Sequence, residues 1–454
     1  MIVATLCIAA AFITGAPRAI ASGGITFETA EQLYVNSKYE QAVTLLTSLA
    51  SAGNAQAANR LGDCYEYGHG VTKNLPKARL LYEQAIKLGS DDALDSLGRM
   101  YRDGLGVTRD DKKAADLFKQ AADQWVARGA YDLSEMYRWG RGTNMSYKLY
   151  LAMLERSANQ GLPEAEHDLA HLYVHGSEAP KFYLDGIAVP KDRQKALELF
   201  ERAARFGWAD PANDVGNLYG YENGVDGKPD YKEAFKWHLR AAEGGNRYGE
   251  REVADAYLKG RGVDADARKS SFWAAKAIAQ FRKEAIEGNL ISQFDLGRMY
   301  QNGLGVPIDN WKARYWYEKA AAHGNPHACN MLALLLWDCP PAGKNQIRAV
   351  ALWKQGARGG CPYAQYNLAR HYDVGGPGTK QNSALAAYWY RIAADRDNFR
   401  AAYYLAQHYE NGIGVAKNIP SAVHYYEIAK GDADQKIVDA SKNSIESLKR
   451  AADH

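Results

Sequence analysis

The chain has 454 residues, with 56 basic and 53 acidic side chains and a formal net charge of +3 at pH 7. Lysine and arginine are scattered and interleaved with aspartate and glutamate, as on an ordinary solvated helical surface, and form no basic stripe of the kind that nucleic acids require. We therefore expect no nucleic-acid partner. Beyond the first residues, no stretch is apolar enough to suggest a transmembrane helix.

The first residues have the pattern of an export signal. Ile2–Ile13 is an apolar run too short to span a bilayer, and it leads to Ala19-Ile20-Ala21, which matches the A-x-A pattern of a cleavage site. We expect residues 1–21 to be a signal peptide that is cleaved near Ala21. The mature chain would then be periplasmic or secreted, and the loss of Arg18 would lower its formal net charge to +2.

Residues 22–56 are expected to form a helix pair that caps the start of the fold. Its helices are predicted at about Thr29–Asn36 and Tyr39–Ala52. This pair lacks the glycine turn that marks the segments after it.

From residue 57 onwards one sequence motif recurs about ten times, as in A-x-x-x-L-G-x-x-Y-x-x-G-x-G-V at Ala93–Val107. Successive tyrosine positions are separated by 36, 36, 36, 46, 38, 43, 36, 36 and 37 residues. Periods in this range predict a solenoid, in which each repeat packs on its neighbours. The aligned position holds Tyr65, Tyr101, Tyr137, Tyr173, Tyr219, Tyr257, Tyr300, Leu336, Tyr372 and Tyr409.

Each repeat is expected to consist of two helices. The first has apolar or small residues at helical spacing, as in Ala57, Leu61 and Tyr65. The second often begins with Lys-Ala followed one turn later by an aromatic residue, as in Lys77-Ala78 and Tyr82. It usually ends at a glycine, which adopts a left-handed conformation without a steric penalty. These glycines are Gly89, Gly161, Gly207, Gly245, Gly288, Gly324 and Gly360.

Six repeats carry G-x-G between the two helices. A dinucleotide-binding motif would need a preceding strand and a βαβ context, whereas each G-x-G here follows a helix pattern, so we interpret it as a turn. A small residue three positions before the tyrosine, such as Gly62, Gly98 or Gly297, is expected to mark a close approach of two helices. The G-x-G pairs are Gly68/Gly70, Gly104/Gly106, Gly140/Gly142, Gly260/Gly262, Gly303/Gly305 and Gly412/Gly414.

Together these motifs resemble the Sel-one-like repeat of exported bacterial proteins, a relative of the tetratricopeptide repeat with a longer loop between its helices. The resemblance covers residues 57–431. It implies an all-α, right-handed α-solenoid of about ten helix-pair repeats, with an N-terminal tetratricopeptide-like cap and a C-terminal capping helix in residues 432–454. Family members are mostly adaptors or scaffolds in secretion, envelope assembly, polysaccharide export and protein quality control, and the repeat has no catalytic motif.

Three repeats depart from the pattern. The fourth has an insertion at about Gly176–Asp192, and the sixth has a lengthened second helix at Ser270–Glu287. The eighth has Leu336 at the tyrosine position and Cys339-Pro340-Pro341 instead of the glycine turn. Extra segments in solenoids often lie on binding faces, and neutral drift in tolerant loops is the alternative.

The cysteines do not follow the pattern of the cysteine-rich relatives. In those relatives two cysteines join the helices of each pair by a disulfide, and the relatives have been linked to penicillin binding and hydrolysis. Here Cys329 and Cys361 are expected at the same end of the stack, which would allow a disulfide in an oxidising compartment. Free thiols or another pairing are the alternatives.

Three histidines at helical spacing form a stripe that is a candidate metal site. His167, His171 and His175 are four residues apart, and two histidines one turn apart can share a zinc ion. Successive steps of four residues drift by about 40° around a helix, so we interpret the stripe as a polar strip and expect no metal. No nucleophile and base stand in a recognisable catalytic motif. We therefore predict no catalytic residues, no cofactor and no enzyme activity.

Two positions before each tyrosine, nine of the ten repeats have a polar residue, and Leu334 is the exception. A position that stays polar among apolar neighbours faces water, and first helices line the concave surface of a solenoid. We therefore predict that this concave row binds a partner, and that surplus tyrosines such as Tyr183, Tyr366, Tyr403 and Tyr404 could line the same surface. The concave row consists of Asp63, Arg99, Glu135, His171, Asn217, Asp255, Arg298, Arg370 and Gln407.

These predictions favour a non-catalytic exported scaffold or adaptor that mediates protein–protein interactions in envelope or exopolysaccharide-export assembly. The alternatives are a periplasmic peptide- or glycan-binding module and, in third place, a β-lactamase-like hydrolase.

Overall fold

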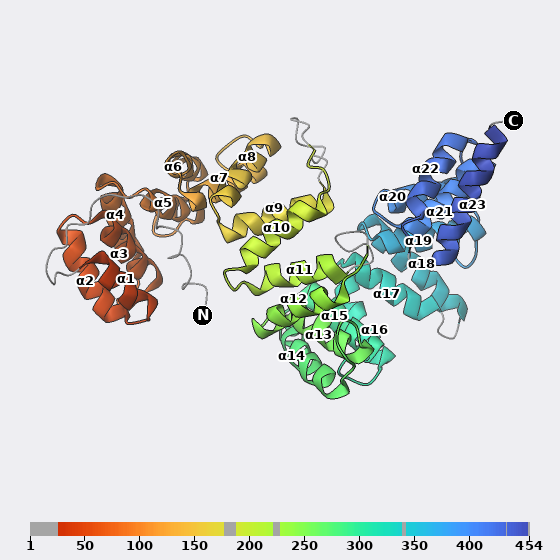
Figure 1. The fold of residues 1–454 in the computed structure, drawn as a ribbon, viewed down its shortest axis with the longest axis horizontal. Coiled ribbons are helices and arrows are strands. Elements are labelled where there is room, and N and C mark those ends of the chain that lie inside the picture. The colour runs from red at the N-terminus through yellow and green to blue at the C-terminus, as the bar shows by residue number, and fades with distance from the viewer. Residues whose placement is uncertain (1–25, 177–187, 221–227, 338–341, 433, 453–454) are drawn as a thin grey trace. The chain divides into compact units, whose positions relative to one another are not determined.

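The computed structural model describes residues 26–176, 188–220, 228–337, 342–432 and 434–452, which form helices joined by turns (Figure 1). These residues contain no strand. The chain divides into two compact units, Met1–Ala212 and Asn213–His454, each built from stacked helix pairs. The predicted all-α solenoid is confirmed. The predicted signal peptide, Cys339, Tyr183 and most of the Gly176–Asp192 insertion lie outside the described residues.

In the part of the chain that the structure describes, ten helix pairs lie between an N-terminal helix pair and a last single helix. The N-terminal cap consists of α1 (Phe27–Val35) and α2 (Tyr39–Ser51), and the last helix is α23 (Gln435–Ala452). The first helices are α3 (Ala55–Tyr67), α5 (Asp92–Asp103), α7 (Ala127–Trp139), α9 (Pro163–His175), α11 (Ala209–Gly220), α13 (Arg247–Lys259), α15 (Leu290–Asn302), α17 (Pro326–Trp337), α19 (Pro362–Val374) and α21 (Phe399–Asn411). The second helices are α4 (Leu75–Lys87), α6 (Asp111–Asp123), α8 (Tyr147–Asn159), α10 (Arg193–Ala204), α12 (Tyr231–Glu243), α14 (Ala267–Ile286), α16 (Asn310–Ala322), α18 (Ala342–Arg358), α20 (Ser383–Ala394) and α22 (Ile419–Ala429).

A capping residue starts most second helices and also closes the turn before them. Asn74 Oδ1 accepts a hydrogen bond from Lys77 N at 3.0 Å, while Asn74 N donates to Tyr65 O at 2.8 Å. The cap satisfies an N–H group that has no partner within the helix, and the second bond ties the cap to the end of the first helix. The same pairing recurs in Asp110/Tyr101, Asp192/Tyr173, Asp266/Tyr257, Asp309/Tyr300 and Asn418/Tyr409.

The G-x-G motif is a turn in the structure, as predicted. Its first glycine ends the first helix in the left-handed conformation, as Gly140 does after α7 with φ 61°. Its second glycine packs against the preceding repeat, because a Cβ added to Gly142 would lie 2.0 Å from Asp111 O. A side chain at this position would displace the neighbouring backbone, so the glycine allows the repeats to stack closely.

The small residue before the tyrosine marks a close helix contact, as predicted. A Cβ added to Gly62 would lie 2.5 Å from Cε1 of Tyr82, and one added to Gly297 would lie 2.6 Å from Cε1 of Tyr317. In these repeats the core is thus a ring on the second helix that packs directly on a small residue of the first. The fully buried rings on second helices are Tyr82, Phe118, Phe200, Phe281, Tyr317, Tyr390 and Tyr426.

The lengthened second helix of the sixth repeat is also present, at Ala267–Ile286 instead of Ser270–Glu287. Helix α14 has 20 residues, whereas α12 and α16 have 13. Seven extra residues make almost two turns, or about 10 Å, and so return the same helix face to the core. Phe281 accordingly takes the buried aromatic position, and Ala274 contacts the turn glycine Gly305 of the next repeat.

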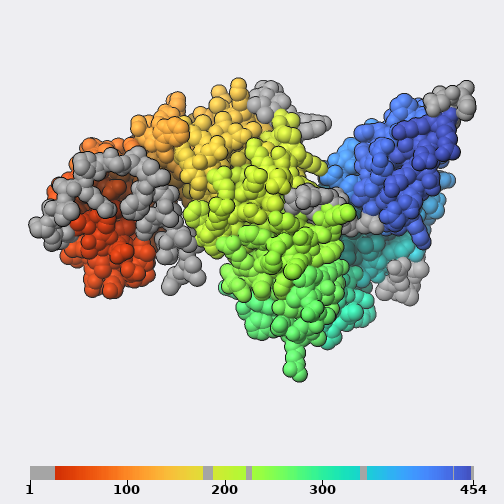
Figure 2. All heavy atoms as spheres, viewed as in Figure 1, coloured from red at the N-terminus to blue at the C-terminus, as the bar shows by residue number. Residues whose placement is uncertain are grey.

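Within each unit, side chains fill the space between neighbouring helices (Figure 2). Each core is therefore built from successive contacts between repeats, as expected for a solenoid. Among the helices that the structure describes, none has both the length and the apolar character that a membrane span needs.

Candidate functional site

Consecutive first helices lie side by side within each unit. Helix α5 packs on α7 in the first unit, and α17 packs on α19 in the second. Ion pairs cross such contacts, with 3.0 Å between Arg102 Nη1 and Asp132 Oδ1 and 2.5 Å between Arg251 Nη1 and Asp295 Oδ1. The residues of the predicted concave row lie on the first helices.

The concave row is less exposed than its polarity suggests. Asp63 is buried and the other eight residues are half-buried, whereas the apolar exception, Leu334, is exposed. The row is therefore engaged with neighbouring side chains in both units. Asp63, Arg99, Glu135 and His171 belong to the first unit, and Asn217, Asp255, Arg298, Arg370 and Gln407 belong to the second.

The prediction that the row faces water is wrong for Asp63, which is 8% exposed. Its Oδ1 accepts a hydrogen bond from Tyr82 OH at 2.9 Å, and its Oδ2 lies 2.7 Å from Arg60 Nη1. Burial raises the pKa of this carboxyl above its usual value, although the charge of Arg60 opposes the shift. Asp63 therefore joins the two helices of its repeat and is not open to a partner.

Arg99 is paired with a buried carboxylate. Its Nε lies 3.2 Å from Asp95 Oδ2, and the side chain of Asp95 is only 5% exposed. Burial and the nearby charge of Asp132 raise the pKa of Asp95. Arg99 Nη1 also donates to Tyr67 OH at 3.2 Å. Removing the guanidinium would leave a buried carboxylate without this counter-charge, so Arg99 stabilises the fold.

In the second unit the row meets the surplus tyrosines. Arg370 stacks on Tyr404, with its Cζ 4.5 Å from the ring centre. Gln407 Nε2 donates to Tyr403 OH at 3.1 Å. Row residues on α19 and α21 therefore form one surface with tyrosines that the sequence already suggested as binding residues.

A groove of about 420 Å³, the inner groove, crosses α17, α19 and α21 beside this surface. Leu334 and Tyr363, which is 63% exposed, provide apolar walls. Asn367 Nδ2 donates to Asn330 Oδ1 at 2.9 Å, and both amides line the groove. Apolar walls with a few fixed polar groups are typical of binding sites. The groove is also lined by Tyr366, Arg396, Phe399, Arg400 and Asp432.

The sequence predicted only part of the inner groove. Tyr366 belongs to the surplus tyrosines, but Leu334 is the apolar exception to the concave row, and Asn330, Tyr363 and Asn367 also lie outside those predictions. One signal could have identified Tyr363, because the residue after the start of α19 is aromatic where α7, α9 and α21 have charged residues. The Asn330–Asn367 pair joins two repeats, so no pattern within one repeat indicates it.

A smaller cavity of about 140 Å³ lies where the fifth repeat departs from the aromatic core. The buried ring position there holds His238, which is 7% exposed, and Gly220 adds no side chain to fill the space. Burial lowers the pKa of His238, and its Nδ1 has no hydrogen-bond partner among the described residues. Row residues Asn217 and Asp255 line the same cavity.

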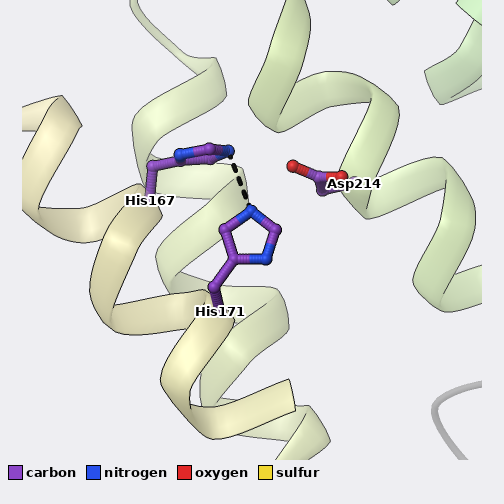
Figure 3. A group of neighbouring side chains, drawn as sticks. All are labelled: His167, His171 and Asp214. Atoms are coloured by element: carbon purple, nitrogen blue, oxygen red, sulfur yellow. Dashed lines mark hydrogen bonds between the residues drawn. The ribbon is translucent and has the colours of Figure 1, made fainter. Parts of the chain in front are cut away.

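Two histidines of the predicted stripe are in contact (Figure 3). His167 Nε2 and His171 Nε2 lie 3.3 Å apart, and both rings pack on Phe200 of α10. His175 is exposed, with its ring centre 6.3 Å from that of His171. The two histidines thus pack against the core of their repeat. That they require no metal stays a prediction.

We expect zinc to bind the wild-type chain no more tightly than micromolar, because a tetrahedral zinc site takes four ligands and the stripe brings two into contact. Calorimetric zinc titration of the wild type and of His171→Ala measures this affinity. Submicromolar binding that disappears in His171→Ala would contradict the prediction.

Cys329 and Cys361 are both buried, and both are free thiols in the structure. Burial raises the pKa of Cys329 to about 11, and the neighbouring Cys361 adds to the shift. Cys361 Sγ lies 3.5 Å from His327 Nδ1. The two cysteines are thus neighbours, as expected. The structure has them as free thiols, one of the alternatives that the sequence leaves open, and a disulfide between them in an oxidising compartment is untested.

The sequence model of the Sel1 repeat family matches nine segments of the chain. Helices α7 and α8 fall between the second and third of these segments and complete the ten helix pairs. The matched segments are residues 55–90, 91–124, 163–205, 212–246, 247–280, 290–325, 326–361, 362–398 and 399–430.

Several known proteins are similar to this chain in sequence or in structure. A protective antigen of uropathogenic Escherichia coli strains that displays an SLR fold is 25% identical, with 89% of this chain and 90% of that chain covered and a TM-score of 0.46. A Sel1 repeat protein from Oxalobacter formigenes is 27% identical, with 56% and 98% covered and a TM-score of 0.48. Protein sel-1 homolog 2 of Mus musculus is 37% identical over 90 residues, which are 19% of this chain and only 13% of the mouse protein. Because the repeat model matches well over half of its residues, the chain belongs to the Sel1 repeat family.

Proposed function

We propose that this chain is a non-catalytic, exported scaffold that holds a protein partner in the inner groove, as part of an envelope or exopolysaccharide-export assembly. Sel1 repeat proteins generally mediate protein–protein interactions, and the repeat scaffold is generally non-catalytic. The apolar run and the A-x-A pattern in residues 1–21 support export. The observation that carries the proposal is the inner groove on three consecutive first helices.

The chemistry of the inner groove suits an extended segment of a protein. Tyr363 and Leu334 offer exposed apolar surface for a side chain of the partner. Asn330 and Asn367 hold each other in place, and each amide has further hydrogen-bonding capacity for a peptide backbone. Arg400 lies at the rim, 3.4 Å from Asp434, where a charged contact would add specificity.

A periplasmic peptide- or glycan-binding module is the second candidate. The Asn330–Asn367 pair favours it, because the same amides would bind an isolated peptide, and the exposed ring of Tyr363 offers a stacking surface for a sugar. Co-purification from the native host separates the two functions. A scaffold retains a defined protein, whereas a peptide or glycan module does not.

Replacing Tyr363 and Leu334 together by alanine is expected to weaken partner binding at least about tenfold, since a few central apolar residues carry most of the energy of an interface. The co-purified partner is purified, and its affinity for each variant is measured by calorimetry. The matched control is Tyr315→Ala with Leu385→Ala, a Tyr and Leu pair on second helices that is also exposed. Unchanged affinity in the groove variant, or an equal loss in the control, would contradict the proposal.

A further inference from the structure

Four consecutive second helices of the second unit have an uneven charge, whereas α12 and α22 together contain three basic and three acidic residues. The spans of α14, α16, α18 and α20 contain 13 lysine and arginine residues but only two glutamates. The equivalent helices of the first unit, α4, α6, α8 and α10, contain 11 basic and seven acidic residues. The expected interleaving of charges therefore fails for α14, α16, α18 and α20, whose exposed side is the outer basic face.

The two glutamates of this face are already paired. Glu318 Oε1 lies 3.1 Å from Arg314 Nε and 3.0 Å from Arg348 Nη2, and Glu284 Oε1 lies 3.2 Å from Arg247 Nη1. Three further basic residues lie near carboxylates, because Lys269 is paired with Asp266, Lys276 with Glu250 and Lys312 with Asp309. The 13 basic residues still outnumber these five carboxylates.

Apolar side chains are exposed among these charges. Trp311 is 77% exposed, and Ile347, which is 36 residues later and in the same position of the next second helix, is 53% exposed. Lys276, Lys312 and Arg348 are also separated by 36 residues and occupy the adjacent position in α14, α16 and α18. Equivalent positions of stacked repeats share a face, so apolar and basic residues form neighbouring rows. Other exposed apolar residues on these helices are Phe272, Ile286, Tyr315, Leu385 and Tyr388.

We propose that the outer basic face binds the surface of a bilayer that contains anionic phospholipids. Tryptophan, phenylalanine and isoleucine side chains would enter the boundary between headgroups and acyl chains, where an interfacial protein buries its apolar surface. The lysine and arginine side chains keep their charged ends at the level of the lipid phosphates while their alkyl stems lie along the apolar rows. The protein then lies on the membrane without crossing it.

The exposed isoleucines favour a bilayer over an acidic polysaccharide. Ile286 and Ile347 are 72% and 53% exposed, and an aliphatic side chain gains from leaving water for an acyl-chain environment. A hydrated glycan offers no such environment, and sugar recognition would use the rings alone. The positive charge would suit an anionic bilayer and an acidic polysaccharide equally well. The exposed apolar residues favour the bilayer.

Sedimentation of the full chain with phosphatidylcholine vesicles, with and without phosphatidylglycerol, tests the proposal. We expect binding only when phosphatidylglycerol is present, and weaker binding at high salt because exposed charges are screened. Lys276→Gln, Lys312→Gln and Arg348→Gln together should raise the lipid concentration for half-binding on the order of tenfold or more. The matched control is Lys87→Gln, Lys112→Gln and Lys119→Gln, three exposed lysines on second helices of the first unit.

The apolar row has its own variant. Trp311→Ser with Ile347→Ser should weaken binding at low and at high salt, since burial of apolar surface is not screened, and melting temperatures show that each variant is folded. Equal binding to vesicles without phosphatidylglycerol, no binding to either vesicle, or an equal loss in the control triple variant would overturn the proposal. Binding to a soluble polyuronate without sedimentation on vesicles would also overturn it. The partner in the inner groove is measured separately, so either proposal can fail alone.

Discussion

Replacing Tyr317 by alanine is expected to lower the free energy of unfolding of the second unit by about 4 kcal/mol. The ring is fully buried against Gly297, and its hydroxyl donates to Gln301 Oε1 at 2.8 Å. The variant loses this hydrogen bond and leaves a cavity between the two helices of the repeat. A stability change of 1 kcal/mol shifts the melting temperature by roughly 2–4 °C in chains of 150–250 residues. Circular dichroism should therefore show a fall of about 10 °C.

Tyr315→Ala is the matched control, because Tyr315 lies on the same helix and is 52% exposed. Its effect should stay within about 0.5 kcal/mol. Since repeats unfold as local units, hydrogen exchange in Tyr317→Ala should increase first in α15 and α16. Equal losses in the two variants would show that the buried ring is not what stabilises the repeat.

Gly142→Ala is expected to destabilise the first unit by about 3 kcal/mol, whereas Gly161→Ala should cost about 1 kcal/mol. Both glycines have left-handed φ angles, 66° and 80°, so both variants strain the backbone. Only at Gly142 would the new Cβ also collide with the preceding repeat, at 2.0 Å from Asp111 O, because a Cβ at Gly161 has nothing within 4 Å. Chemical denaturation of both variants measures the difference.

That difference isolates the packing between repeats from the conformational preference of glycine. If the two alanine variants lose the same stability, the second glycine of G-x-G serves only the turn, and the close stacking of Gly142 on Asp111 contributes nothing measurable.

Features contained within one repeat could be predicted from the sequence. The small residue Gly62 and the ring of Tyr82 recur at fixed spacing, so their contact follows from the pattern alone. The seven extra residues of α14 could be predicted as well, because they lengthen the interval between Tyr257 and Tyr300. Repetition makes such features reliable, because each repeat independently supports the same assignment.

Features that depend on individual side-chain contacts could not be predicted in this way. Asp63 has the polarity of a solvent-facing residue, but it is buried and bonded to Tyr82 and Arg60 of its own repeat. The inner groove depends on Asn330 and Asn367, which meet across two repeats. The spacing of polar positions shows which helix face they share but not how deeply the neighbouring repeat covers them.

The burial of the row also changes how its function should be tested. Reversal of Arg99 to glutamate would place a second negative charge beside the buried Asp95, so lost partner binding could reflect lost folding. Tyr363 and Leu334 are exposed, and their replacement tests binding without that complication.

Photocrosslinking in the native host is the most direct test of partner binding in the inner groove. A benzoylphenylalanine in place of Tyr363 should capture one defined protein, which the same group in place of the exposed Tyr388 on α20 should not capture. Mass spectrometry of the crosslinked peptides then identifies the partner segment. Capture of that protein from position 388 and not from 363, or no capture from 363 by a folded variant, would contradict the assignment of the groove.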